Sequence, residues 1–256
     1  MSGLWAVGVR VSDQLEGRNL VIEVLKRKRR KVHRVLLDER AKPNPKINEL
    51  LSLVEKHGVA LRRVERRKLD EMSRTGVHNG VIAIAEPHYC YTARERLEEL
   101  FSKGIDPFFI LADELNYEQN LGAILRSAMG AGVHAVVVPT RRGKGLTPVV
   151  QRVAMGGAEE VPVIREGLSS VLKVLRKEGI RIVGADMDGE PCWSVPMRGP
   201  IAMVLGGEHK GLTSTLRHRC DAIVSVPLKH SLDSLNVSVT AGILMFEKVR
   251  QEASVG

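Results

Sequence analysis

The sequence predicts an α/β protein with two modules, a small basic one followed by a larger one built on a mostly parallel sheet. The 256 residues are 43% hydrophobic and 27% charged, which is an ordinary globular composition. From residue 107 onward, apolar strand segments alternate with helical patterns, as in parallel sheets covered on both faces. The charge is uneven, since residues 1–90 carry 19 Lys+Arg but only 11 Asp+Glu and the remainder is nearly balanced.

We expect residues 1–86 to form the small α/β module. Asn19 is a suitable N-cap for a helix that starts after Gly17 and ends in the basic run 26–31, where the helix dipole favours cations. Hydrophobic periodicity predicts the other elements, which are strands at 32–37, 59–64 and 81–85, helices at 47–57 and from 66 onward, and turns at 42–45 and 76–80.

A linker at 87–106 is expected to separate this module from the second one at 107–256. Within the linker, residues 93–101 have a helical pattern. In the second module, strands are predicted at 108–112, 135–139, 181–185, 201–205 and 222–226, with helices at 122–130, 148–155, 168–178 and 237–249. Ligands of such sheets bind at the carboxyl ends of the strands, so we expect the functional residues in the loops that follow them.

Composition excludes several classes of protein. No stretch approaches the roughly 18 uncharged apolar residues of a membrane span, and the start of the chain lacks the pattern of a signal peptide. Cys90, Cys192 and Cys220 are too few and too dispersed for a disulfide framework, so a reducing cytoplasm is the expected compartment. The eight histidines show no metal-ligand spacing, and we expect no bound metal.

A glycine-rich loop, Gly206-Gly207-Glu208-His209-Lys210-Gly211, follows the predicted strand 201–205. It lacks the Gly-Lys-Ser/Thr ending of a phosphate-binding P-loop, and no Gly-x-Gly-x-x-Gly follows any strand. NTPase and dehydrogenase functions therefore lose their main support. Taken alone, the loop is equally explained as a turn that connects a strand to a helix.

Two further segments carry polar residues where chemistry would need them. Arg126 lies in an otherwise apolar helix six residues after Asn120, and such an arginine needs either an anionic ligand or a partner such as Glu114 or Glu118. Ser234 and Asn236 precede the last predicted helix and can present a hydroxyl and an amide to a ligand. Helix capping alone explains one of the two, but not readily both.

Together the three segments are far more specific than any one. In the order Asn120-x-Gly122-x-x-x-Arg126, Gly206-Gly207-Glu208-x-x-Gly211, and Val226-Pro227 with Ser234-Leu235-Asn236-Val237-Ser238, the chain resembles the SpoU (TrmH-like) family of RNA ribose 2′-O-methyltransferases over about residues 108–250. With Gly17-Arg18-Asn19 and His78-Asn79-Gly80-Val81, the first module looks like the L30e-like substrate-binding domain of the branch that methylates guanosine in 23S ribosomal RNA.

The resemblance implies a deep trefoil knot of the SPOUT type in the second module, a homodimer formed through that module, and S-adenosylmethionine as cofactor. It implies the cofactor-binding residues Thr140, Gly206, Gly207, Val226 and Leu235. It also implies the catalytic residues Arg126, Asn120, Glu208, Ser234 and Asn236. Arg126 would lie near the ribose hydroxyl, either as the base or as an anchor for an RNA phosphate, and free arginine is almost always protonated.

The basic first module is expected to meet RNA. Further contacts to RNA phosphates are expected from Arg141, Arg142 and Lys144, and from the first-module residues 26–31, Arg62, Arg63, Arg66, Arg67 and Lys68. Two alternatives stay open, namely a non-catalytic RNA-binding protein of ribosome assembly and a transfer RNA 2′-O-methyltransferase. A small-molecule enzyme would leave the positive charge of residues 1–90 unexplained.

Overall fold

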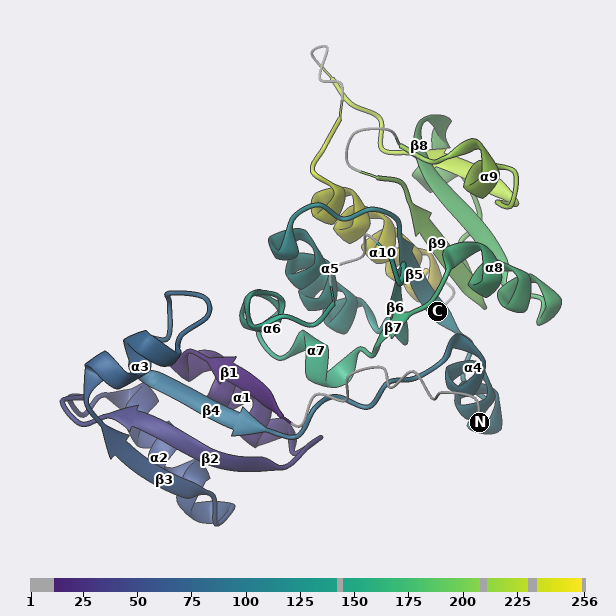
Figure 1. Ribbon diagram of the computed structural model, residues 1–256. Helices are drawn as coiled ribbons and strands as arrows, with labels where there is room; N and C mark the ends of the chain where they lie inside the picture. The colour runs from purple at the N-terminus through teal and green to yellow at the C-terminus, as the bar shows by residue number, and fades with distance from the viewer. Residues whose placement is uncertain (1–11, 142–144, 208–210, 230–233, 255–256) are drawn as a thin grey trace, which may run out of the picture. The chain divides into compact units, whose positions relative to one another are not determined.

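The computed structural model describes residues 12–141, 145–207, 211–229 and 234–254, and the chain divides into two compact units, Met1–Tyr89 and Cys90–Gly256 (Figure 1). The first unit contains a four-stranded mixed sheet with the strand order β1-β4-β2-β3. Its elements are β1 (Asp13–Glu16), α1 (Arg18–Arg27), β2 (Val32–Asp38), α2 (Pro45–Lys56), β3 (Ala60–Val64), α3 (Arg66–Met72) and β4 (Val81–Ala85).

Helices α1 and α2 cover one face of this sheet, and α3 covers part of the other. Val35 and Leu37 on β2 point to the first face and lie in one core with Leu50 of α2. Leu36, which lies between them, points to the second face and packs with Leu69 of α3. The alternation follows from the two-residue period of a strand.

The start of α1 corrects one prediction. Gly17, and not Asn19, is the N-cap, and its φ of 101° is a conformation that favours glycine. The Gly17 amide donates a hydrogen bond of 3.0 Å to the Val81 carbonyl, so the chain turns from β1 directly into α1. Strand β1 is not predicted by the sequence pattern because Leu15 is its single apolar side chain.

Glu16 is a fully buried carboxylate that holds the loop after α3. It accepts hydrogen bonds from the Ser73 hydroxyl (2.7 Å), the Arg74 amide (2.7 Å) and the Thr75 hydroxyl (2.6 Å). Burial alone raises the pKa of Glu16, but these bonds and one from Gln14 outweigh it and lower the pKa from 4.5 to about 2. The ionised carboxylate therefore stabilises the fold above pH 4.5, and this stabilisation is lost as the pH falls toward 2.

Glu16→Gln is expected to destabilise the first unit by about 3 kcal/mol at neutral pH, the equivalent of the shift in pKa. The difference from the unchanged protein should shrink as the pH falls below 4.5, because that protein then loses the same charge. Amide hydrogen exchange of β1 and β4 in the full chain, measured between pH 7 and pH 3, tests this. Glu65→Gln, at an exposed position, is the control. A destabilisation that does not change with pH would contradict the assignment.

The second unit contains a six-stranded sheet in which all neighbouring strands are parallel, in the order β10-β8-β9-β5-β6-β7. The strands are β5 (Phe108–Ala112), β6 (Ala135–Val138), β7 (Val163–Arg165), β8 (Arg181–Pro191), β9 (Ile201–Leu205) and β10 (Ala222–Ser225). The helices are α4 (Ala93–Ser102), α5 (Glu118–Ala131), α6 (Pro148–Ala154), α7 (Gly157–Glu160), α8 (Leu168–Lys177), α9 (Ser214–Arg217), α10 (Val237–Ala253) and the 3-10 turn η1 (Cys192–Ser194).

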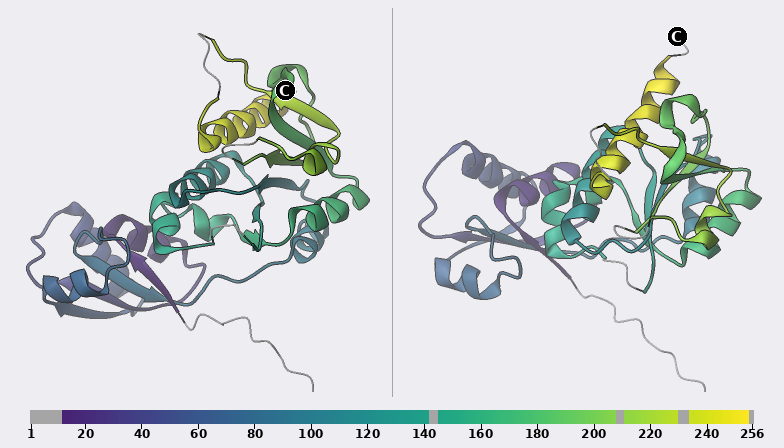
Figure 2. Two further views of the ribbon diagram at one scale, coloured as in Figure 1. Left: turned by 45° about the horizontal axis from the view of Figure 1, so that its top comes forward. Right: turned by 90° about the horizontal axis from the view of Figure 1, so that it is seen from above.

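Helices cover both faces of this sheet. Helices α5, α6, α7 and α10 share one core with the strands, and α4, α8 and α9 share the other. Helix α4 lies within the expected linker, and its Leu97 and Leu100 are buried in the second of these cores. Helices α5 and α10, teal and yellow in Figure 2, lie side by side.

Strand β7 and helices α7 and α9 are absent from the sequence prediction because each has only three or four residues. The predicted strand 181–185 continues to Pro191 as β8, and its register with β10 shifts between Ile223 and Val224. The trefoil knot depends on the paths of the loops after β9 and β10, and because 208–210 and 230–233 lie outside the described residues, it stays a prediction.

Two glycines let helices approach α5 closely. A Cβ on Gly122 would lie 2.6 Å from the Cβ of Val153 on α6, and one on Gly157 of α7 would lie 2.6 Å from the Leu125 carbonyl oxygen. Both distances are too short for any larger residue, so α5 is held against α6 and α7. This packing fixes the start of α5, which carries Asn120.

Candidate active site

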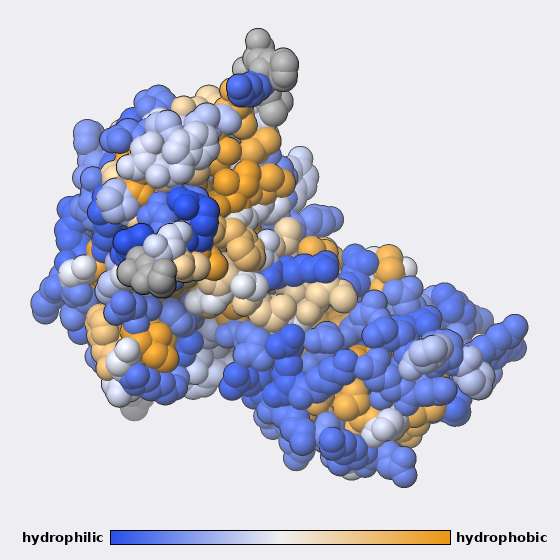
Figure 3. Space-filling model, turned by 180° about the vertical axis from the view of Figure 1, so that it is seen from behind, coloured by the Kyte–Doolittle hydropathy of each residue, from blue (hydrophilic) through white to orange (hydrophobic). Residues whose placement is uncertain are grey.

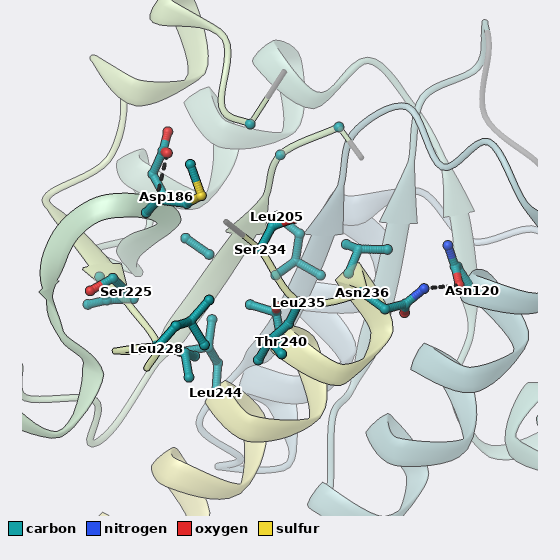
Figure 4. A pocket seen from close by; sticks show the side chains of 18 of the residues that line it. Asn120, Asp186, Leu205, Ser225, Leu228, Ser234, Leu235, Asn236, Thr240 and Leu244 are labelled. Carbon is teal, nitrogen blue, oxygen red and sulfur yellow. Dashed lines mark hydrogen bonds between the residues drawn. The ribbon is translucent and has the colours of Figure 1, made fainter. Parts of the chain in front are cut away.

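A cavity of about 780 Å³ lies at the carboxyl ends of β9 and β10 and against the middle of β8, beside the starts of α5 and α10 (Figure 4). Its volume suits a ligand of cofactor size. The three segments singled out in the sequence all reach it. Seven of the predicted site residues line it, namely Asn120, Gly206, Gly207, Val226, Ser234, Leu235 and Asn236.

Asn120 and Asn236 join two of these segments directly. The Asn236 amide nitrogen donates a hydrogen bond of 3.1 Å to the side-chain oxygen of Asn120, although 116 positions separate them (Figure 4). Asn236 is also the N-cap of α10, because its side-chain oxygen accepts a 2.9 Å bond from the Ser238 amide. Asn120 is not an N-cap, as α5 begins at Glu118. Each asparagine therefore has a role in holding the other.

The glycine loop after β9 forms one wall of the cavity. Gly207 and Gly211 exchange two backbone hydrogen bonds of 3.0 and 3.1 Å, which close the loop on itself. A Cβ on Gly206 would lie 2.1 Å from the Gly211 carbonyl carbon, so the backbones meet where a side chain would be. This packing brings main-chain groups, rather than side chains, to the surface of the cavity.

The wall combines apolar and polar groups. Leu205, Leu228 and Leu244 supply apolar surface, whereas Ser225 and Thr240 supply hydroxyls (Figure 4). An apolar wall with a few polar groups is the usual lining of a site that holds a nucleoside-like molecule. A ligand with an aromatic base and a polar tail fits this lining.

Asp186 is a cavity residue that the sequence analysis missed. It is the single charged side chain among the described residues of the lining, and its carboxylate lies 3.3 Å from Arg217 and accepts a 2.8 Å bond from the Met187 amide. It follows the five residues predicted as strand 181–185, so the rule that ligands bind at carboxyl ends of strands could have found it. Tyr117 and Thr240 also line the cavity without having been predicted.

Arg126 is not among the residues that line the cavity. It is exposed, and it has no hydrogen bond or ion pair with the residues that the structure describes, including the suggested partners Glu114 and Glu118. Six helical residues rotate a side chain by about 240° around the axis, which turns Arg126 away from the side of Asn120. The suggested pairing of Arg126 with Glu114 or Glu118 is therefore wrong, whereas its contact with an anionic ligand stays a prediction.

Thr140 also lies outside the lining. It follows β6, which is on the far side of β5 from β9, and its carbonyl oxygen accepts a 3.0 Å bond from Arg165. Arg141 is exposed in the same loop. The predicted residues Arg142, Lys144 and Glu208 lie outside the described residues.

Other kinds of site are not seen in the described part of the chain. No group of three His, Cys, Asp or Glu side chains there could hold a metal ion. None of Cys90, Cys192 and Cys220 forms a disulfide with another described residue, and burial raises the pKa of Cys220 to about 11. None of the described helices is both long and apolar enough to span a bilayer.

Two family models match the chain. The SpoU rRNA Methylase family matches residues 107–246, and RNA 2′-O ribose methyltransferase substrate binding matches residues 14–90. The 23S rRNA (guanosine-2′-O-)-methyltransferase RlmB of Escherichia coli (strain K12) is 36% identical, over 95% of this chain and 100% of its own length. The Bacillus subtilis (strain 168) protein YacO, provisionally named as a TrmH family tRNA/rRNA methyltransferase, is 36% identical over 95% of this chain and 98% of its own length.

Solved structures have the same fold. The SpoU methyltransferase AviRb from Streptomyces viridochromogenes, solved with the cofactor AdoMet, has a TM-score of 0.79 at 23% identity and covers 95% of this chain and 91% of its own. A crystal structure titled RNA 2′-O ribose methyltransferase has a TM-score of 0.76 at 26% identity, with 95% and 90% covered. The chain belongs to the SpoU family of S-adenosylmethionine-dependent RNA 2′-O-ribose methyltransferases.

Proposed function

We propose that this protein transfers a methyl group from S-adenosylmethionine to the ribose 2′-hydroxyl of a guanosine in 23S ribosomal RNA. The observation that carries the proposal is the meeting of Asn120, the loop at Gly206 and the segment 234–236 around one cavity. The 36% identity to RlmB over the whole of that enzyme supports the choice of RNA and nucleotide. An enzyme with this substrate would work in the cytoplasm, where free thiols persist.

The cavity fits the proposed cofactor. The closed glycine loop and the leucines would hold the adenosine part, and Gly206, Val226 and Leu235 would bind it through their main chain. When bound, S-adenosylmethionine supplies an electrophilic methyl group on a positively charged sulfur. The carboxylate of Asp186 suits the positive charge of such a ligand.

The chain's own residues must then orient the ribose and accept its proton. Asn120 and Asn236, already bonded to each other, form a rigid polar pair that can hold a hydroxyl in position. Ser234 lies in the same wall, Glu208 follows Gly207 in the sequence, and we assign both to the pocket for the ribose. We assign Arg126 either to accepting the proton of the ribose hydroxyl or to holding the neighbouring RNA phosphate.

Mapping of ribose methylation tests the function. Ribosomal RNA from a strain that lacks the gene should miss one 2′-O-methylguanosine, and the purified protein with S-adenosylmethionine should restore that single mark. The same RNA already carrying the mark is the control and should accept no methyl group. A missing mark in transfer RNA, with 23S RNA unchanged, would contradict the ribosomal assignment.

The alternative of a non-catalytic RNA-binding protein makes a different prediction. Such a protein has no reason to keep an open cavity with the Asn120–Asn236 pair at its wall. Calorimetry with S-adenosylmethionine separates the two, because the enzyme should bind it stoichiometrically. Absence of binding would favour the assembly protein.

We further propose that the protein is a homodimer formed through the second unit. Val239, Ile243 and Phe246 on α10 are 49%, 37% and 49% exposed, and their spacing places them on one side of the helix. Figure 3, which views the molecule from behind, shows apolar surface on the second unit. An apolar stripe of this kind is typical of a subunit interface.

Ile243→Glu with Phe246→Glu is therefore expected to give monomers. In a symmetric dimer the two new carboxylates would face the same carboxylates of the partner subunit. Their repulsion adds to the cost of removing these charges from water. Sedimentation at micromolar concentration measures the state of assembly. Arg250→Gln removes an exposed cation, 2.7 Å from a carboxylate oxygen of Glu247, from the same helix and should leave the dimer intact. A variant that remains dimeric would place the interface elsewhere.

A further inference from the structure

We propose that the RNA backbone is held by the uncovered half of the sheet in the first unit, and not by its helical layer. This inference rests on the proposed function, because it names the surface that the RNA substrate would meet. The uncovered half is defined by the residues Gln14, Arg34, Ala60, Arg62 and Ile84.

The strand register places these residues on one face. Arg34 is paired with Ala60 on one side and Ile84 on the other, so the three form one row across the sheet. Arg62 lies in the next row, opposite Leu36. Leu69 of helix α3 packs against Leu36 and covers it. Arg34, Ala60 and Arg62, on the same face, are exposed. Figure 1 looks onto this face, with α1 and α2 behind the strands.

The two arginines on this face are unpaired. Neither Arg34 nor Arg62 has an ion pair or side-chain hydrogen bond with the described residues, and the nearby carboxylates are already in use. Glu16 is saturated by the loop after α3, and Asp38 is buried, 3.4 Å from Arg66. The positive charge of the face is thus uncompensated.

The helical layer on the opposite face differs. The ammonium nitrogen of Lys26 lies 2.6 Å from one carboxylate oxygen of Glu49, and that of Lys46 on α2 lies 3.2 Å from the other. A guanidinium nitrogen of Arg27 lies 3.2 Å from a carboxylate oxygen of Glu23. Figure 3 shows this layer, whose surface is predominantly hydrophilic. Binding a phosphate there would first require these pairs to be broken, whereas Arg34 and Arg62 are available without that cost.

The chemistry of the face points to phosphates rather than bases. Arginine presents a planar fork of donors that matches phosphate oxygens. None of the five residues that define the face is aromatic, so it offers no ring on which a base could stack. Arg34 and Arg62 are on neighbouring strands, offset by two residues, which separates their Cα atoms by roughly 8 Å. They can therefore reach two phosphates of one RNA strand.

The double variant Arg34→Ala with Arg62→Ala tests the proposal in the full-length protein. The probe is a 23S ribosomal RNA transcript, and its affinity is measured at several salt concentrations. Loss of two phosphate contacts should weaken binding roughly ten- to thirty-fold at 0.1 M salt and reduce the slope of log affinity against log salt by about 1.4 to 2. In methylation assays, KM for the RNA should rise while kcat at saturating RNA is unchanged.

Two further variants make the test specific. Arg34→Lys with Arg62→Lys keeps the charges and should restore affinity to within about threefold, since lysine also binds phosphate as a point charge. Lys46→Ala with Lys56→Ala removes two exposed charges from α2, on the helical layer, and should leave the salt slope near its original value. Amide hydrogen exchange of β2 and β4 reports on correct folding of the first unit, and affinity for S-adenosylmethionine, a property of the other unit, should be unchanged.

The outcomes separate this inference from the function on which it rests. If the alanine variant binds RNA with unchanged affinity and salt slope, the assignment of RNA binding to this face is overturned, while the methyltransferase function stands. An equal loss of RNA affinity in the variant Lys46→Ala with Lys56→Ala would also overturn the proposal. The effect would then come from the overall positive charge of the unit and not from this face. If the unaltered protein itself fails to bind the transcript, the proposed RNA substrate fails.

Discussion

Arg126→Ala is expected to reduce methyl transfer by a factor of about 10² to 10⁴, the usual contribution of a group that moves or holds a proton. Affinity for S-adenosylmethionine should stay the same, because Arg126 does not line the cavity. The fold should also be unaffected, since the side chain is exposed and makes no ion pair with the described residues. Stopped assays of methylated RNA and calorimetry of cofactor binding measure the two quantities separately.

The position of Arg126 predicts how it reaches the reaction. Two neighbours of Arg126 on α5 lie close to α10. A Cβ on Gly242 of α10 would lie 3.7 Å from the hydroxyl oxygen of Ser127, one residue after Arg126. A Cβ on Gly130, four residues after Arg126, would lie 3.5 Å from the ring of Phe246 on α10. Helix α5, which carries Arg126, therefore packs against α10, which carries the apolar stripe proposed as the dimer interface. We expect it to act in the cavity of the partner subunit.

Mixed dimers test this directly. Neither Arg126→Ala nor Asn236→Ala alone should be active, but mixing the two variants should restore up to roughly a quarter of the original activity when subunits exchange freely. Arg126→Lys, which keeps a charge but not the planar fork, should recover only part of the rate. Full activity of Arg126→Ala would remove the residue from the mechanism, and failure of the mixture would place it in its own subunit's site.

Gly206→Ala is expected to weaken S-adenosylmethionine binding roughly ten- to hundred-fold. The added methyl group would lie 2.1 Å from the Gly211 carbonyl carbon, so the loop must open. Overpacking against a fixed backbone commonly costs about 1–3 kcal/mol, and each 1.4 kcal/mol is a factor of ten in affinity. The loop that forms the cavity wall would lose the shape that receives the cofactor.

Gly207→Ala is the matched control for this prediction. Among the residues that the structure describes, its Cβ would meet the Cβ of Glu114 alone, at an ordinary contact distance of 3.5 Å. Calorimetry should therefore give a smaller loss of affinity for Gly207→Ala than for Gly206→Ala. Equal affinities in the two variants would show that the loop does not form the binding wall.

Elements with several consecutive apolar residues were predictable from the sequence, and elements with few apolar residues were not. The strands at 108–112 and 201–205 have the predicted bounds because five consecutive apolar residues between turn signals admit few other structures. β1 escapes prediction because Leu15 is its single apolar side chain, and β7 because it has only three residues. Asn19 was predicted as a cap from its side chain, but the positive φ that the turn requires selected Gly17 instead.

The site shows the same division. The motifs at Asn120, Gly206 and 234–236 predict the cavity wall through the family resemblance that they carry, because such motifs are local in sequence. Their hydrogen bond across 116 positions, and the inclusion of Asp186, depend on which strands are neighbours. Thr140 is not among the lining residues for that reason, since β6 follows β5 in the chain but lies on its far side from β9.

The sequence by itself determined the α/β class, the uneven charge and the family, because composition, periodicity and motif order are properties of the chain. Only the tertiary structure decided that Arg126 is exposed outside the cavity, and that Arg34 and Arg62 are unpaired on one face while Lys26 and Lys46 are neutralised on the other. The physical reason is that pairing and exposure depend on distances between segments remote in sequence, which the order of residues does not contain.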